Sequence, residues 1–189
     1  MDVYQAIYKR RTIRKFKQQK IDRKVLEKLI DAARFAPSGN NLQPVKYRIV
    51  EEPEEVAKVF EQVKWAGYIA PEGNPKKGEE PVAFIMVLAD TNIRKAGYEL
   101  DVGAAVQNLL LSAVEEGIGT CWIGSVNRDN VRNILNIPEN LVISTAIALG
   151  YPAEEPVSEE EQGSIKYYKD SNGVLHVPKR ALRDIIINS

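Results

Sequence analysis

The chain has one cysteine and one histidine among its 189 residues, and this scarcity excludes several kinds of site. A single cysteine, Cys121, cannot form an intrachain disulfide, which favours a reducing, cytoplasmic environment. Structural and catalytic zinc sites use several Cys or His ligands at fixed spacings, so we expect no metal. Cys121 lies in an apolar segment, where a thiol is usually inert filler. We expect His176 to pack or to face solvent rather than to act as an acid or base.

Long apolar runs and net charge are also missing. No segment approaches the ~20 apolar residues of a membrane helix, and the opening MDVYQAIYKRR lacks the apolar stretch of a signal peptide. Lys plus Arg equals Asp plus Glu at 26 each, so the net charge favours no polyanionic partner. A hydrophobic content of 44% with 28% charged residues is typical of a globular protein. We therefore expect a cytoplasmic protein that binds neither membrane nor nucleic acid.

The signatures of protein-based catalysis are absent as well. There is no Walker loop, and the glycines of GIGTCWIG lack the spacing of a Rossmann dinucleotide fingerprint. No pairing of nucleophile and base is visible. We therefore predict that no side chain is the catalytic group and that a bound cofactor carries the chemistry.

The apolar periodicity predicts alternating helices and strands in one domain, residues 1–189. Helices are expected over 2–10, 22–36, 54–64, 101–116 and 127–136, and strands over 45–49, 82–89, 120–125 and 142–149. A hairpin is expected around 171–173. The acidic stretch 153–161 resembles a solvated loop, and 65–81 a flexible excursion and candidate lid. The mixed order of elements favours a three-layer α+β sandwich.

Two polar clusters are suited to an anionic, hydrogen-bonding ligand. The first combines guanidinium groups, which bind phosphate bidentately, with a hydroxyl donor, and comprises Arg10, Arg11, Thr12 and Arg14. With Phe16 nearby, it fits a basic surface or nucleic-acid patch equally well. The second, PSGNNLQP at Pro37 to Pro44, places amides on a backbone loosened by Gly39, where they can read a heterocycle edge. By itself it also fits an ordinary capped turn.

The two clusters occur in an arrangement that resembles a known family. RRTIRKF followed by APSGNNLQP resembles the paired signature of the nitroreductase flavoproteins, R-R-S-x-R-x-F and A-P-S-x-x-N-x-Q-P-W. DVGAAVQNLLLSAVEEGIGTCWIG resembles the family's central block, and VPKRALRDII resembles its closing P-K-R-x-L segment. The four matches occur in order over nearly the whole chain. Thr12 departs from the commoner Ser but keeps the hydroxyl, whereas Val45 replaces a common Trp and puts the shape of the pocket in doubt.

The resemblance implies an α+β fold with a central mixed, mainly antiparallel sheet flanked by helices. It also implies a homodimer that binds FMN in two interface clefts. By carry-over, the first cluster holds the phosphate, the ribityl chain and the pyrimidine edge, with Lys179 and Arg180 joining at the phosphate. The backbone of Ile123 and Gly124 would lie near flavin N5. The isoalloxazine would be contacted from the other subunit by Pro37, Ser38, Gly39, Asn41 and Gln43.

The activity implied is oxidoreduction by a ping-pong mechanism. NAD(P)H would reduce FMN, and a small-molecule acceptor such as a nitro compound or quinone would then take the electrons. Trp65 and Tyr68 either shape the substrate pocket or, as the more ordinary role, pack in the core or surface. Two alternatives stay open: a flavoenzyme of the same fold that performs dehalogenation or dehydrogenation, and a non-enzymatic flavin- or nucleic-acid-binding module.

Overall fold

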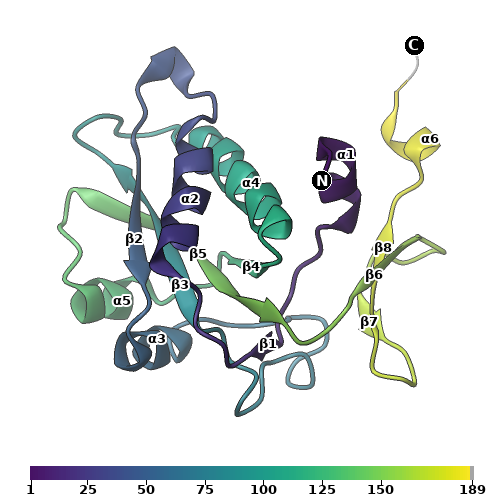
Figure 1. The fold of residues 1–189 in the computed structure, drawn as a ribbon. Coiled ribbons are helices and arrows are strands. Elements are labelled where there is room, and N and C mark those ends of the chain that lie inside the picture. The colour runs from purple at the N-terminus through teal and green to yellow at the C-terminus, as the bar shows by residue number, and fades with distance from the viewer. Residues whose placement is uncertain (188–189) are drawn as a thin grey trace.

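The computed structural model describes residues 1–187, which form a layered body, residues 1–152, and a C-terminal arm, residues 153–187 (Figure 1). The body contains α1 (Val3–Lys9), β1 (Phe16–Lys17), α2 (Arg23–Arg34), a 3-10 turn (Gly39–Asn41), β2 (Val45–Val50), α3 (Pro53–Phe60), β3 (Ala83–Asp90), α4 (Glu99–Glu115), β4 (Gly119–Ile123), α5 (Arg128–Leu135) and β5 (Leu141–Pro152). The arm contains β6 (Val157–Glu160), β7 (Tyr168–Lys169), β8 (Leu175–Lys179) and α6 (Leu182–Ile185).

The central sheet has five strands, in the order β1-β5-β3-β2 with β4 also paired to β5. Every pairing within it is antiparallel. In β3 the side chains from Ala83 to Ala89 are all buried, as expected for an apolar strand that is covered on both faces. These side chains alternate between two cores, because successive residues of a strand point to opposite faces.

Two pairs of helices cover the two faces of this sheet. Ile85 and Val87 of β3 pack with residues of α2 and α4, including Leu29 and Leu109. Phe84 and its alternate neighbours on β3 pack with residues of α3 and α5. The three-layer α+β sandwich predicted from the sequence is therefore confirmed. The helix expected to be central, α4, contacts α1, α2 and three strands.

Most of the predicted elements are confirmed, with local corrections. Asp22 caps α2 by accepting a hydrogen bond from the Lys24 N–H group, as the sequence predicted. The helix expected over 54–64 ends at Phe60. No helix or strand forms in 65–81, where Trp65 and neighbouring residues are nevertheless buried; its mobility stays a prediction. The acidic stretch was wrongly predicted as a loop, because Val157–Glu160 forms β6.

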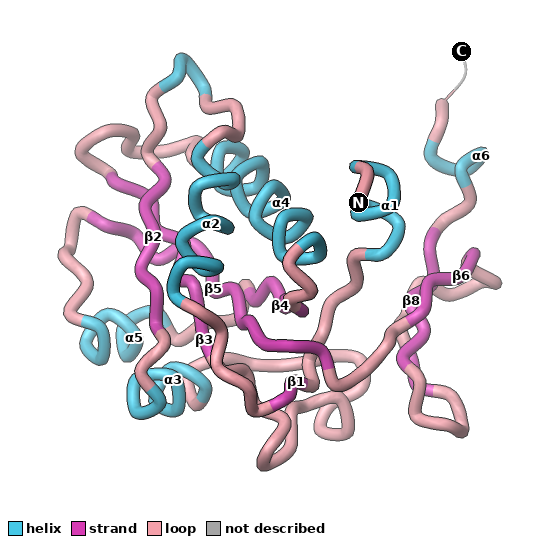
Figure 2. Tube along the Cα trace, viewed as in Figure 1, coloured by secondary structure: helices cyan, strands magenta, loops and turns pink. Residues whose placement is uncertain are grey.

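The arm continues from β5 and ends beside the N-terminal side of the body (Figure 2). Its three-stranded sheet has the order β6-β8-β7, with β6 parallel and β7 antiparallel to β8. The pairing of Tyr168 with His176 confirms the predicted hairpin. Within residues 1–187, none of the helices combines the length and the hydrophobicity that crossing a bilayer requires.

Candidate functional site

The basic N-terminal segment lies along β4 and is held there by backbone contacts. Thr12 forms a parallel bridge with Thr120, and the Ile13 N–H group donates to the Thr120 carbonyl at 2.9 Å. The close approach depends on glycine, since a Cβ at Gly119 would lie 2.9 Å from the Ile13 side chain. Gly150, paired with Gly119 across the sheet, gives Phe16 the same room. The sheet therefore fixes where the basic cluster sits.

The arm brings the far end of the chain to the same place. Arg11 donates a hydrogen bond to the Ser158 hydroxyl of β6. β6 pairs in parallel with β8, and the Glu161 N–H group donates to the Lys179 carbonyl at 2.8 Å. A Glu154 carboxylate oxygen accepts the N–H group of Arg14 at 2.6 Å. Figure 1 shows the segment between α1 and β1, which contains the arginines, and strand β8, which ends at Lys179, on one side of the molecule.

The side chains of these cations form no ion pair in the described part of the chain, although Glu154 accepts the backbone N–H group of Arg14. Within residues 1–187, no ion pair with a carboxylate involves the five cations predicted at the cofactor site, Arg10, Arg11, Arg14, Lys179 and Arg180. Burial lowers the pKa of Arg10, and burial together with the charge of Arg10 lowers the pKa of Arg11. A bound anion would oppose both shifts, because a nearby negative charge favours the charged form of a guanidinium. The cluster is therefore suited to receive a negatively charged group.

Arg14 has a further unsatisfied group. Its Nε atom is buried and has no hydrogen-bond partner within the described residues, while its guanidinium lies 5.1 Å from the centre of the Tyr167 ring. A buried polar atom without a partner is costly, so such an atom at a cationic cluster indicates a missing acceptor. The donor set thus fits a ligand with both an anionic group and neutral acceptors.

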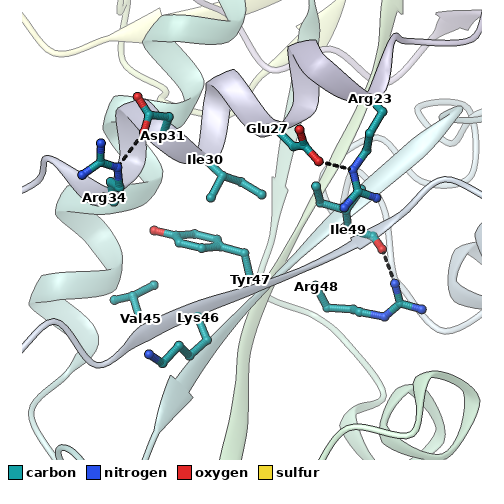
Figure 3. A pocket seen from close by; sticks show the side chains of 10 residues that line it. All are labelled: Arg23, Glu27, Ile30, Asp31, Arg34, Val45, Lys46, Tyr47, Arg48 and Ile49. Atoms are coloured by element: carbon teal, nitrogen blue, oxygen red, sulfur yellow. Dashed lines mark hydrogen bonds and ion pairs between the residues drawn. The ribbon is translucent and has the colours of Figure 1, made fainter.

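A groove between α2 and β2 provides a contrast (Figure 3). It has a volume of about 570 Å³ and also contains several basic side chains. Here, however, Arg23 pairs with Glu27 at 2.9 Å and Arg34 with Asp31 at 2.6 Å. Burial raises the pKa of Tyr47 in its wall to about 12, so the phenol stays neutral. This groove has less unbalanced charge to offer an anion than the N-terminal cluster.

The end of β4 continues the surface beside the arginines. Gly124 is exposed, and a Cβ there would meet nothing within 4 Å, so its backbone can be approached closely. The carbonyl of buried Ile123 accepts the Thr145 hydroxyl at 2.6 Å, and the Gly124 carbonyl accepts the Val126 N–H group at 3.2 Å and Arg128 Nη2 at 3.3 Å. Burial raises the pKa of Cys121 in the same strand to about 11. The predicted inert role of this thiol agrees with that environment.

The second predicted cluster lies elsewhere in the protomer. The Gly39 N–H group donates to Asp101 at the start of α4. The N-terminal amine instead bonds Glu115 at the other end of this helix, and β4 begins shortly after it. From Asp101 to Glu115, α4 is about 21 Å long at 1.5 Å per residue. One protomer therefore does not bring the loop of Pro37, Ser38, Gly39, Asn41 and Gln43 to its own arginines.

The other residues named in the sequence analysis, His176, Trp65 and Tyr68, make packing or polar contacts. His176 lies between Glu159, at 2.8 Å from Nδ1, and Asp170, at 3.5 Å from Nε2. Trp65 is buried against Phe60, with 5.6 Å between ring centres, which agrees with the packing role. The excursion also contacts the arm, because the Tyr68 and Tyr167 rings lie 4.9 Å apart.

Sequence reasoning missed the residues that fasten the site. Glu154 and Ser158 belong to the stretch that was predicted as a loop, and no pattern marks them. Asp101 heads the central block that resembled the family, but its partner Arg94 has no such signal. The sequence offered one clue, since Asp101 shares a helical face with the apolar residues Ala105 and Leu109.

Comparison with known proteins agrees with this geometry. The model of the nitroreductase family matches residues 7–151. The chain belongs to the nitroreductase family. The matched residues include nearly all of the body, whereas the arm lies beyond them.

Sequence relatives and solved structures both resemble this chain. An Archaeoglobus fulgidus protein with the provisional name NADH dehydrogenase/NAD(P)H nitroreductase is 35% identical over 156 residues, covering 79% of this chain and 84% of its own. A solved nitroreductase family protein from Clostridium novyi is 31% identical with a TM-score of 0.68, covering 80% of this chain and 87% of its own. An FMN-dependent nitroreductase from Clostridium difficile is 25% identical with a TM-score of 0.68, covering 82% and 90%.

Proposed function

We propose that this nitroreductase-family protein is an FMN-dependent NAD(P)H oxidoreductase that works as a cytoplasmic homodimer. The observation that carries the proposal is a set of five cations from both ends of the chain on one side of the molecule, whose side chains form no ion pair with a carboxylate within residues 1–187. A flavin phosphate is the anion that this arrangement suits. The FMN-dependent relative from Clostridium difficile supports the same cofactor, and the Archaeoglobus fulgidus relative, through its name, supports NAD(P)H as the co-substrate.

The residues of this protomer fit one half of the cofactor. Arg10 and Arg11, with Lys179 and Arg180 of the arm, would hold the phosphate by charge-assisted hydrogen bonds. Thr12 would offer its hydroxyl to the ribityl chain. The unsatisfied Nε of Arg14 would donate to the pyrimidine edge, where a cation also stabilises negative charge on reduction.

The other half requires a second copy of the chain. Because α4 separates the Pro37–Gln43 loop from the arginines, the loop would close the site of the partner protomer. Apolar side chains stay exposed on the same side of the molecule as the arginines, on α1 and the arm's end: Val3, Tyr4, Tyr8, Leu182, Ile185, Ile186 and Ile187. Exposed apolar surface of this extent is typical of an interface. We propose that the partner covers it.

Bound FMN would supply the redox chemistry, accepting hydride from NAD(P)H and passing electrons to a nitro compound, quinone or similar acceptor in a ping-pong cycle. The chain's own part is to bind, orient and tune. The open backbone at Gly124 would admit the reacting ring face. We expect no side chain of the site to act as a catalytic acid or base, because the hydride transfer belongs to the cofactor.

The visible spectrum tests the flavin proposal. Purified protein should be yellow, and NADH or NADPH should bleach it under anaerobic conditions, followed by reoxidation with a nitroaromatic or a quinone. Colourless protein that does not bind added FMN would contradict the proposal, and salt-sensitive DNA or RNA binding would then favour a nucleic-acid module. Bleached protein that reduces halogenated substrates instead would favour the dehalogenating alternative.

Subunit mixing tests the shared site. Arg11→Ala and Gly39→Val should each abolish tight FMN binding, because they damage different halves of every site. In a refolded mixture, half of the dimers are mixed and each has one intact site, so about a quarter of the sites should bind FMN. A mixture that binds no FMN, or a protein that is monomeric by light scattering while it binds FMN, would contradict the homodimeric site.

A further inference from the structure

The loop that would meet the partner's flavin has a strained backbone. Asn40, Asn41 and Gln43 have φ angles of 51°, 55° and 53°, in the left-handed region that side chains other than glycine rarely adopt. Within the loop, the Gln43 N–H group donates to the Ser38 hydroxyl at 2.9 Å. Asn40 and Asn41 are exposed. A conformation of this kind persists only where surrounding contacts impose it.

Asp101 supplies one such contact from outside the loop. The residue is 5% exposed, and it is the one charged residue among the buried residues of the described chain. Oδ1 accepts the Gly39 N–H group at 3.0 Å, and Oδ2 accepts Arg94 Nη1 at 2.9 Å. The first turn of α4 also favours a negative charge. The carboxylate thus joins the loop to the first turn of α4.

Arg94 completes the support. Its Nε atom donates to the Ala96 carbonyl at 3.1 Å, which fixes the guanidinium. A Cβ at Gly39 would lie 2.6 Å from Arg94 Nη1, and one at Gly97 would lie 3.0 Å from Nη2. The guanidinium therefore lies directly against the loop backbone. The absence of a side chain at Gly39 allows this contact, and a Cβ there would displace the guanidinium.

We propose that Asp101 and Arg94 are positioning residues, which hold the 37–43 loop in the backbone conformation that presents it to the flavin of the partner protomer. They act through Gly39 and need not touch the flavin themselves. The inference rests on the proposed function for its final step. The contacts among Asp101, Arg94 and Gly39 belong to one protomer and do not depend on flavin.

The first measurement is amide hydrogen exchange on flavin-free protein. Asp101→Asn and Arg94→Met should speed exchange at residues 39–43 by about tenfold, since a hydrogen bond to a charged group is lost. Arg94→Lys, which keeps the charge, should have a smaller effect. Glu55→Gln, which breaks the Arg48–Glu55 ion pair of 3.2 Å, is the matched control and should leave the loop unchanged. Arg94→Met keeps the test decisive if Asp101→Asn does not fold.

The second measurement is FMN titration of the same variants. Asp101→Asn and Arg94→Met should weaken binding about tenfold and change the visible circular dichroism of the bound flavin, which lost stability alone would not do. Unchanged loop exchange, or a loosened loop with unaltered affinity and dichroism, would overturn the proposal. Wild-type protein that binds no FMN would refute the proposed function separately, because exchange in flavin-free protein still decides whether Asp101 and Arg94 hold the loop.

Discussion

The body and the arm are held together by different forces. In the body, two apolar cores enclose β3 on both faces, and burial of this kind is the main source of folding stability. In the arm, Leu175 and Ala181 are the buried apolar residues of the described part. Polar contacts attach the arm to the body, among them the Glu154 carboxylate. A region attached in this way can adapt to a partner, while the body provides a fixed frame.

Truncation of a leucine in each region should have unequal effects. Leu109→Ala in α4 should lower the free energy of unfolding by about 2–5 kcal/mol, because it leaves a cavity in a fully buried core. Leu175→Ala should loosen the arm and change the unfolding of the body much less. Urea denaturation followed by circular dichroism measures the first effect, and limited proteolysis the second. Equal losses of unfolding free energy in the two variants would contradict the difference between the body and the arm.

Cys121 reports on opening of the body alone. With its pKa raised to about 11 by burial, the thiol should resist a disulfide reagent near neutral pH until the body opens. Leu109→Ala should speed labelling by roughly thirtyfold or more, in line with its loss of stability. Leu175→Ala should leave the rate unchanged. Rapid labelling of the native wild type would contradict a sealed core.

Glu154→Gln should weaken the attachment of the arm by about 1–3 kcal/mol, because one Glu154 carboxylate oxygen accepts the N–H groups of both Arg14 and Lys15. Faster hydrogen exchange over residues 153–161, without a shift in the body's urea midpoint, is the expected result. The neighbouring exposed Glu155→Gln is the matched control. Identical exchange in the two variants would show that Glu154 does not fasten the arm.

The smallest expected effect is a pH dependence confined to the arm. Glu159 and Asp170 raise the pKa of His176 above 6.5, and His176 in turn helps to lower theirs. A raised histidine pKa gives stability that is complete below pH 6.5 and is lost as the pH rises through the folded value. The two carboxylates contribute in the opposite direction, because the stability they provide is lost as the pH falls through their lowered pKa values. The arm should therefore resist proteolysis best in mildly acidic solution.

A substitution of His176 isolates its contribution to this pH dependence. His176→Gln should flatten the change in arm proteolysis above pH 6, while the body's near-ultraviolet dichroism stays constant in both proteins. Because the group is exposed, we expect a modest change. If the wild-type arm resists proteolysis equally at pH 6 and pH 8.5, the charges of His176, Glu159 and Asp170 do not stabilise it.

Local sequence patterns predicted the body better than the arm. The apolar run 82–89 identified β3, and Asp22 identified the start of α2, because burial on two faces and helix capping leave local signatures. The strand Val157–Glu160 left none, since an exposed, acidic strand alternates no more clearly than a loop. It forms because β8 pairs with it, and that pairing is a contact between segments distant in the sequence.

The candidate site shows the same division. Its residue types were readable from the sequence, since three guanidinium groups beside a hydroxyl indicate an anion, and the ordered motifs indicated the family. The positions of these residues in space could not be predicted from the sequence. Only the tertiary structure decided that Arg11 meets Ser158, that Asp101 and Arg94 hold Gly39, and that α4 separates the two polar clusters. The physical reason is that composition and spacing specify what each segment can bind, whereas the packing of helices on the sheet determines which segments meet.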